Sequence, residues 1–80
     1  MEQATIASEL IKFLENNIVS EEIQVSPDQV LYDIGIDSYS IVEMVLFIER
    51  RFGVVVPDHL LLPENFKTVN ALSEVVIKLL

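Results

Sequence analysis

Few side chains in this 80-residue sequence could take part in covalent chemistry or bind a metal ion. The chain has no cysteine and a single histidine, His59, which excludes disulfides, thiolate metal sites and sites built from several histidines. A hydrolytic pair of Ser38 and His59 would lack a third orienting residue and the sequence pattern of a nucleophile elbow. The sequence therefore predicts no catalytic residue and no bound metal.

The segment that ends at Ser38 is the best candidate for a functional site. It reads D-I-G-I-D-S from Asp33 onward. Its two aspartates and the glycine between them have the spacing of the first three ligand positions of an EF-hand calcium loop. However, Ser38 takes the place of the required glycine at the sixth position, and Met44 that of the glutamate at the twelfth. Calcium binding is therefore not expected.

The same segment also fits an ordinary helix start. Asp37 or Ser38 could accept a hydrogen bond from a free backbone N–H of the first turn. Separately, S-I-V-E from Ser40 onward fits the S-x-x-E capping box. On a helix Ser40 points away from Ser38, so we expect it to cap rather than to be modified. Taken alone, the Asp-Ser pair indicates only where a helix begins.

Composition excludes several classes of function. Thirteen acidic and five basic side chains give a net charge of −8, which repels nucleic acid and attracts basic protein surfaces. Half of the residues are hydrophobic and only two are glycine, so residues 1–80 should form one packed domain. There is no signal-peptide pattern and no apolar run long enough to cross a bilayer. We expect a cytoplasmic monomer.

Three stretches have the hydrophobic period of an amphipathic helix. The first runs from Thr5 to Ile18. The second runs from about Ser38 to Phe52, and Gly53 supplies a stop signal. The third follows Thr68, a suitable N-cap, and keeps Ser73 mostly off its apolar face. These three helices should position the candidate site.

The connections complete the predicted fold. Ser20–Asp37 is rich in turn formers but keeps apolar side chains, so it should be a long loop packed on the core. Val54–Val56 has no strand to pair with and should be extended. Asp58 could cap a short helix through Leu62, which Pro63 interrupts. The prediction is an all-α four-helix bundle with three longer helices, one short helix and a long first loop.

With these elements in place, the segment L-Y-D-I-G-I-D-S, which ends at Ser38, resembles the phosphopantetheine attachment region of acyl and peptidyl carrier proteins. The family pattern is an apolar residue followed by D-x-G-x-D-S, before an amphipathic helix such as the one that contains Glu43. The resemblance extends along almost the whole chain, through R-F-G at Arg51, V-P-D at Val56 and the last helix after Thr68. It is to the stand-alone type of carrier, which implies a bundle of the acyl-carrier type.

The resemblance implies a non-catalytic carrier. A phosphopantetheinyl transferase would attach 4'-phosphopantetheine from coenzyme A to Ser38, with Asp37 contacting the transferase and its metal. The thiol of the arm would hold acyl or aminoacyl groups as thioesters for fatty acid, polyketide or nonribosomal-peptide-like biosynthesis. The alternative from another class is an unmodified acidic helical module that binds a basic partner protein.

The second predicted helix also has a candidate docking surface. Ser38, Val42 and Leu46 are spaced four residues apart and form one line along a helix. Acidic side chains beside this line would suit basic patches on transferases, ligases or synthases, although Val42 and Leu46 could instead widen the core face. The predicted docking residues are Tyr39, Val42, Glu43, Leu46 and Glu49.

Two departures from the family pattern concern the cargo. Ser40 replaces an acid common in carriers for primary fatty acid synthesis, and Arg50 and Arg51 end the helix, which argues against that role. The arginines could also simply complement the helix dipole. The stretch L-L-L-P-E-N-F from Leu60 is more like that of stand-alone carriers for activated amino or aryl acids. Its leucines could line an acyl pocket or belong to the core.

Overall fold

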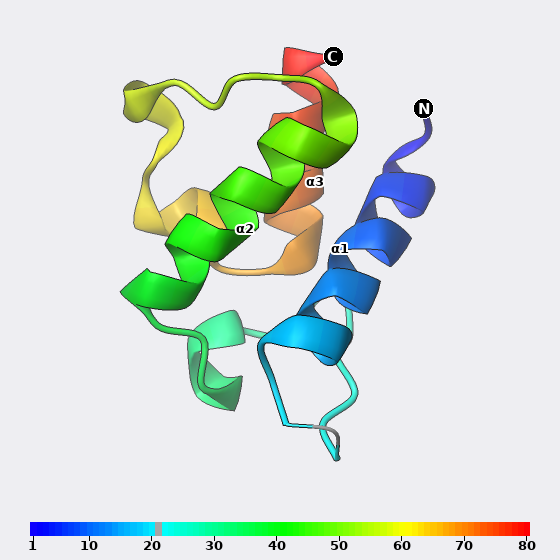
Figure 1. Ribbon diagram of the computed structural model, residues 1–80, viewed down its shortest axis with the longest axis vertical. Coiled ribbons are helices and arrows are strands. Elements are labelled where there is room, and N and C mark those ends of the chain that lie inside the picture. The colour runs from blue at the N-terminus through cyan, green and yellow to red at the C-terminus, as the bar shows by residue number, and fades with distance from the viewer. Residues whose placement is uncertain (21) are drawn as a thin grey trace.

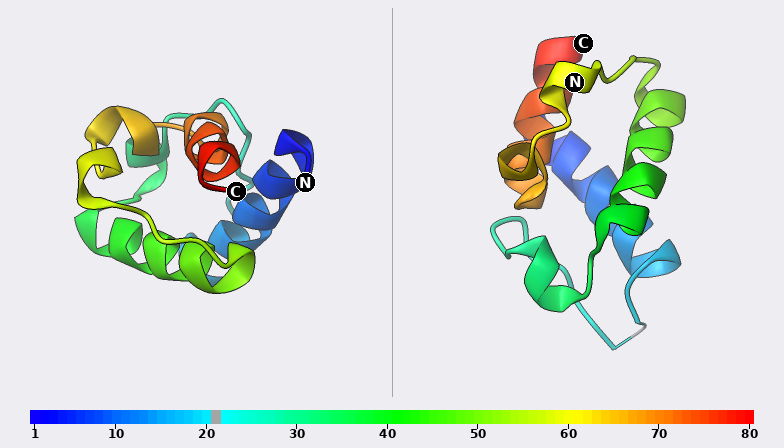
Figure 2. Two further views of the ribbon diagram at one scale, coloured as in Figure 1. Left: turned by 90° about the horizontal axis from the view of Figure 1, so that it is seen from above. Right: turned by 90° about the vertical axis from the view of Figure 1, so that its left-hand side faces the viewer.

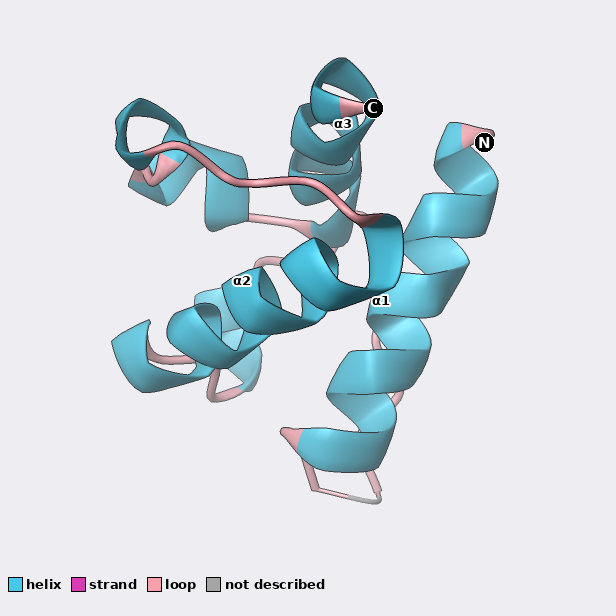
Figure 3. Cartoon of the chain, turned by 45° about the horizontal axis from the view of Figure 1, so that its top comes forward, coloured by secondary structure: helices cyan, strands magenta, loops and turns pink. Residues whose placement is uncertain are grey.

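The computed structural model describes residues 1–20 and 22–80, and this part of the chain is all-helical, as predicted, with no β-strand (Figures 1 and 3). Within these residues, three 3₁₀ helices lie in the connections between three α-helices. The α-helices are α1 (Gln3–Asn17), α2 (Ser38–Phe52) and α3 (Val69–Leu79), and the 3₁₀ helices are η1 (Leu31–Ile34), η2 (Asp58–Leu60) and η3 (Pro63–Phe66).

The α-helices surround one core. α1 packs against both α2 and α3, and the connection from α2 to α3 crosses the side of the molecule away from α1 (Figures 1 and 2). The described part of the first loop runs past one end of the bundle and returns to the start of α2. That start therefore lies at a corner of the molecule, with its side open to a partner.

The predicted helical periods bury the expected residues. Each helix directs one apolar stripe inward, and all three α-helices contribute almost completely buried apolar side chains. They are Ile6, Leu10 and Leu14 of α1, Met44 and Ile48 of α2, and Val69, Leu72 and Val76 of α3.

Three details of the helices differ from the prediction. α1 begins at Gln3 rather than Thr5 and ends one residue before Ile18, because packing and the chain's turns set the ends of a helix as much as its apolar period does. Ser73, expected mostly off the apolar face, is fully buried. Its hydroxyl donates a hydrogen bond to the Val69 carbonyl at 2.8 Å, which satisfies the polar group inside the core.

The first loop packs on the core, as its apolar residues predicted. Val25, Leu31 and Ile36 are buried, and Leu31 is fully so. The Val25 N–H donates to Glu15 Oε2 at 2.9 Å, and the Leu31 N–H donates to the Lys67 carbonyl at 2.9 Å. These bonds attach the loop to α1 and to the segment before α3. The loop also contains η1, which the turn-forming residues did not predict.

The predicted short helix from Asp58 to Leu62 is wrong in detail. The chain forms two 3₁₀ helices there, η2 and η3. Pro57, rather than Asp58, occupies the N-cap position of η2, and Asp58 lies in its first turn. Pro63 begins η3, because the first helical position needs no N–H donor and suits the fixed φ of proline. Val54–Val56, in contrast, is a connector outside any strand, as expected.

We expect Leu31→Ala to lower the free energy of unfolding by about 2–5 kcal/mol, because it removes a fully buried side chain that anchors the first loop. Urea unfolding followed by circular dichroism measures this loss. Val55→Ala is the control: Val55 is 76% exposed, so its truncation should change the free energy by less than about 0.5 kcal/mol. Similar losses in the two variants would contradict the packed loop.

Candidate functional site

Asp37 sets the start of α2. It is the N-cap residue, and its Oδ1 accepts hydrogen bonds from the Ser40 backbone N–H at 2.9 Å and the Ser40 hydroxyl at 3.1 Å. The predicted S-x-x-E capping box from Ser40 is therefore wrong. Ser40 is the third helical residue and donates to the cap, because α2 begins three residues before the box would allow.

These hydrogen bonds also change the acidity of the cap. They lower the pKa of the Asp37 carboxyl below its ordinary value, with the backbone N–H of Ser40 contributing most and its hydroxyl next. Both donors stabilise the ionised carboxylate and not its protonated form. Asp37 therefore remains a negatively charged cap under mildly acidic conditions.

Ser38 is the first helical residue and is exposed. Its hydroxyl forms no hydrogen bond with any residue that the structure describes. The positive end of the α2 dipole lies at this position and favours an attached phosphate group. Gly35, with φ +93°, allows the turn by which the chain leaves η1 and approaches this corner. The site thus has an accessible hydroxyl that fits a phosphodiester.

The predicted docking line lies on the surface of α2. Val42 and Leu46 are 58% and 46% exposed, so they do not widen the core face. Tyr39, next to Ser38, is 75% exposed, and Glu43 is half-buried beside the line. These four side chains and Ser38 share one accessible side of the molecule.

Glu49 has a different structural role from the other predicted docking residues. Its Oε2 accepts a hydrogen bond from the Val56 N–H at 2.9 Å. This bond holds the connector after α2 against the last turns of the helix. The carboxylate is therefore occupied within the chain, and its contribution to docking stays a prediction.

The three leucines at the end of η2 and after it divide between the two predicted alternatives. Leu60 packs against the core, whereas Leu61 and Leu62 are about 40% exposed and line a cavity of about 290 Å³. Tyr32 of η1 and Val42 of α2 line the same cavity. Sequence reasoning missed Tyr32 as a site residue, although it lies inside the L-Y-D-I-G-I-D-S motif and could have been noticed there.

The remaining candidate features do not form a second centre of chemistry. His59 lies exposed in η2. Within residues 1–20 and 22–80 no three histidine or acidic side chains are grouped as a metal site would require. In the same residues, no helix combines the length and apolar character that a membrane span needs.

Comparison with known proteins identifies the family. The family model described as the phosphopantetheine attachment site matches residues 5–76. The chain belongs to this carrier-protein family. Its cofactor is 4'-phosphopantetheine, and the exposed hydroxyl at the start of α2 fits that group. The resemblance noted in the sequence is thereby confirmed over nearly the full length of the chain.

Two curated relatives are aminoacyl carrier proteins of Bradyrhizobium diazoefficiens. Aminoacyl carrier protein 2 is 31% identical over 75 residues, which cover 94% of this chain and 82% of the relative. Aminoacyl carrier protein 1 is 33% identical, with 80% and 69% covered. The acyl carrier protein of Zymomonas mobilis is 45% identical, but over only 51% of this chain and 60% of its own length.

Solved structures show the same fold. In a crystal structure of Bradyrhizobium japonicum glycine:[carrier protein] ligase complexed with glycylated carrier protein, the matching chain has a TM-score of 0.72 and 29% identity, with 91% of this chain and 96% of that chain covered. A second complex of the ligase, with its cognate carrier protein and an analogue of glycyl adenylate, gives a TM-score of 0.75. The carrier-type bundle is thus confirmed.

The lowered pKa of Asp37 predicts how α2 responds to acid. A carboxyl whose pKa is lower in the folded than in the unfolded chain stabilises the fold above its unfolded-state pKa, and this stabilisation is lost as the pH falls through the folded-state pKa. We therefore expect Asp37→Ala to reduce stability at neutral pH but to have little effect once the pH lies below both pKa values.

Urea unfolding at a series of pH values measures this difference. Asp33→Ala removes a nearby exposed carboxylate that accepts no hydrogen bond within the described residues, and it serves as the charge-matched control. An Asp37→Ala effect that is equally large at neutral and strongly acidic pH would show that the charge of the cap is unimportant.

Proposed function

We propose that this protein is an aminoacyl carrier, that Ser38 Oγ is its attachment atom, and that amino-acid-activating ligases load it. The observation that carries the proposal is the exposed Ser38 hydroxyl directly after the Asp37 cap, inside the segment that the family model matches. Phosphopantetheine supplies a flexible arm with a terminal thiol, on which the carried group forms a thioester. Aminoacyl cargo is favoured because the relatives matched over most of this chain are named aminoacyl carriers.

The corner at the start of α2 supports attachment at Ser38 rather than at Ser40. Both hydroxyls lie in the first turn, but Ser40 donates its hydroxyl proton to Asp37 and is half-buried. Ser38 has no such bond and is exposed. A transferase could therefore reach the Ser38 hydroxyl without breaking the cap, and Asp37 would present its negative charge beside the reacting atom.

Partner enzymes would dock on the exposed line of α2. We propose that a phosphopantetheinyl transferase and an aminoacyl ligase both contact Tyr39, Val42 and Leu46, with Glu43 pairing with a basic side chain of the partner. The exposed apolar side chains supply burial on binding, and the acidic neighbour supplies orientation and faster association. The net charge of −8 favours partners with basic docking surfaces.

Modification at Ser38 predicts a specific mass change. We expect the unmodified protein to gain the mass of one phosphopantetheine when it is incubated with coenzyme A and a broad-specificity transferase. Ser38→Ala should gain none, because it lacks the attacking oxygen. Ser40→Ala, the matched control in the same turn, should still be modified. Intact-protein mass spectrometry measures all three.

The result also separates the carrier from the unmodified interaction module. No gain in the wild-type chain, or an equal gain in the Ser38→Ala variant, would rule out Ser38 as the attachment residue. If the wild-type chain gained the mass of phosphopantetheine and only Ser40→Ala lost this gain, the attachment residue would be Ser40 rather than Ser38. The interaction module, in contrast, predicts a Ser38→Ala variant that retains full function in its own cells.

The proposed cargo predicts which group the arm carries in cells, and the proposed docking line predicts how much of the protein is loaded. Protein purified from its own cells should release an amino acid on mild alkaline hydrolysis of the thioester, and Val42→Asp should lower the fraction that is loaded, because a buried carboxylate would weaken the ligase contact. Val55→Asp places the same charge at another exposed valine, outside α2, and should load normally. Mass spectrometry identifies the group and measures its occupancy.

Fatty acyl or polyketide groups on the purified protein would overturn the aminoacyl proposal while leaving Ser38 as the attachment residue. Equal loading of the Val42→Asp and Val55→Asp variants would argue against the docking line alone. The same mass-spectrometry measurement on the wild type and the two variants therefore tests the aminoacyl cargo and the docking line separately.

A further inference from the structure

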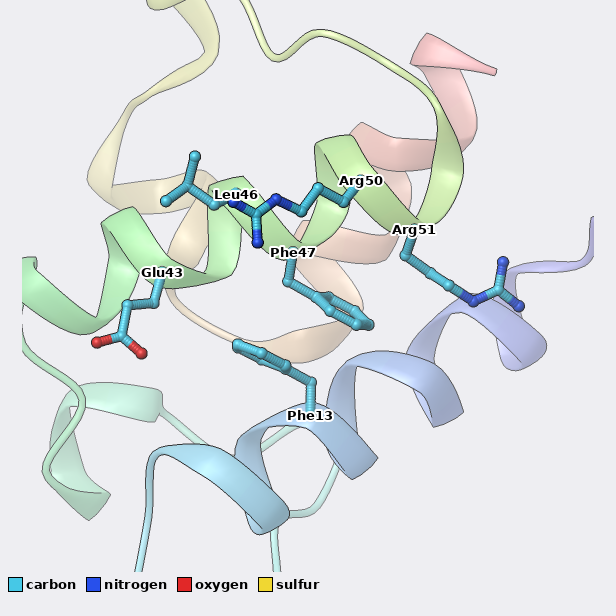
Figure 4. A pocket seen from close by; sticks show the side chains of 6 residues that line it. All are labelled: Phe13, Glu43, Leu46, Phe47, Arg50 and Arg51. Carbon is cyan, nitrogen blue, oxygen red and sulfur yellow. The ribbon is translucent and has the colours of Figure 1, made fainter.

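A groove between α1 and α2 adjoins the exposed docking line and shares Glu43 and Leu46 with it (Figure 4). It has a volume of about 410 Å³. Phe13 of α1 and Phe47 of α2 point toward each other, and their rings stack with centroids 4.3 Å apart, so they form its floor. We call this surface the α1–α2 groove, and it is lined by Phe13, Glu43, Leu46, Phe47, Arg50 and Arg51.

One end of the groove is basic in a strongly acidic chain. Arg51 forms an ion pair with Glu9 at 2.9 Å and lies over the Phe52 ring at 5.3 Å, so its charge is already engaged. Arg50 is exposed and forms no ion pair with any residue that the structure describes. Its guanidinium group is therefore available to a carboxylate from outside the chain.

The other end of the groove is acidic. Glu43 lies seven residues before Arg50, which is two helical turns or about 10.5 Å along α2. The half-buried aromatic rings of Phe13 and Phe47 line the same groove on its α1 side. The groove thus presents an apolar floor, together with a negative and a positive residue that lie two turns apart on one helix.

We propose that the α1–α2 groove binds an amphipathic helix of a partner protein whose exposed face presents a basic residue to Glu43, a large apolar residue to the Phe13–Phe47 floor and an acidic residue to Arg50. A helix laid along α2 repeats these contacts at the same two-turn spacing. A second copy of this chain fits poorly as the occupant, because two molecules of charge −8 repel each other.

The proposal explains Arg50 and goes beyond a simple basic docking partner. The net charge alone favours any basic surface on a partner. The groove instead favours a partner helix with one acidic residue to face Arg50 and one basic residue to face Glu43. Opposite charges at the two ends would select against uniformly basic helices, since a second lysine would face Arg50. The inference concerns the unmodified chain and does not depend on attachment at Ser38.

Three stapled helical peptides provide the probes. The mixed peptide has Lys, Leu and Glu at positions i, i+3 and i+7. In the doubly basic peptide Lys replaces the Glu, and in the truncated peptide Ala replaces the Leu. Each is titrated into the Ser38→Ala variant, which cannot be modified at that position, and binding is followed by amide chemical shifts in NMR spectra.

The mixed peptide should bind at least about fivefold more tightly than the doubly basic one. Its largest shifts should fall on the amides of Phe13, Phe47 and Arg50, and the truncated peptide should lose most of the affinity. In Arg50→Glu the preference should reverse toward the doubly basic peptide. Lys78→Glu makes the same change of charge on exposed α3 and should keep the original preference.

Three results would overturn the proposal. They are equal or tighter binding of the doubly basic peptide to the Arg50-containing protein, shifts that lie outside the groove, and concentration-dependent shifts without peptide, which would make a second copy the occupant. Because the protein in these titrations has no hydroxyl at position 38, none of these results bears on phosphopantetheine attachment.

Discussion

The two hydrogen bonds that Asp37 Oδ1 accepts from Ser40 determine where α2 begins, and the position of Ser38 depends on that start. A cap one residue later would make Ser38 the N-cap residue and place it outside the helix. Ser38 would then no longer align with Val42 and Leu46 on the exposed side. The cap thus couples local helix chemistry to the geometry of both the proposed attachment residue and the proposed docking line.

Other carboxylates in this acidic chain also have structural roles. Glu15 accepts the Val25 N–H, and Glu49 accepts the Val56 N–H, each at 2.9 Å. In both cases a side chain near the end of a helix satisfies a backbone donor in the following extended segment, where no strand is available to do so. Segments that lack regular structure are thereby held firmly enough to deliver α2 and α3 to their places.

Much of this arrangement could be predicted from the sequence. Apolar periodicity predicted the three α-helices, Gly53 predicted the end of α2, and Thr68 predicted the start of α3, where its Oγ1 accepts the Ala71 N–H. These signals are local, since a cap or a stripe involves residues within a few positions. The Asp-x-Gly-x-Asp-Ser segment likewise identified Ser38 as the candidate, because the relevant side chains adjoin one another in the chain.

Features that depend on distant contacts could not be predicted in this way. The Arg51–Glu9 pair joins residues 42 positions apart, and the stacking of Phe13 on Phe47 requires the packing of α1 against α2 to be known. Ser40 was taken for a cap because two overlapping signals compete for one helix start, and only the three-dimensional geometry decides between them. The 3₁₀ helices were missed because proline and aspartate mark turns without specifying their pitch.

Both ends of α2 are fixed, by the Asp37 cap at one end and by the Glu49–Val56 and Arg51–Glu9 bonds at the other. The helix therefore has a constant length between Ser38 and Arg50, about 18 Å for twelve residues. An enzyme that binds the carboxyl end of α2 would find Ser38, the proposed attachment residue, at a set distance from its binding surface. Every enzyme that binds this end of α2 would therefore find Ser38 at the same distance from its binding surface.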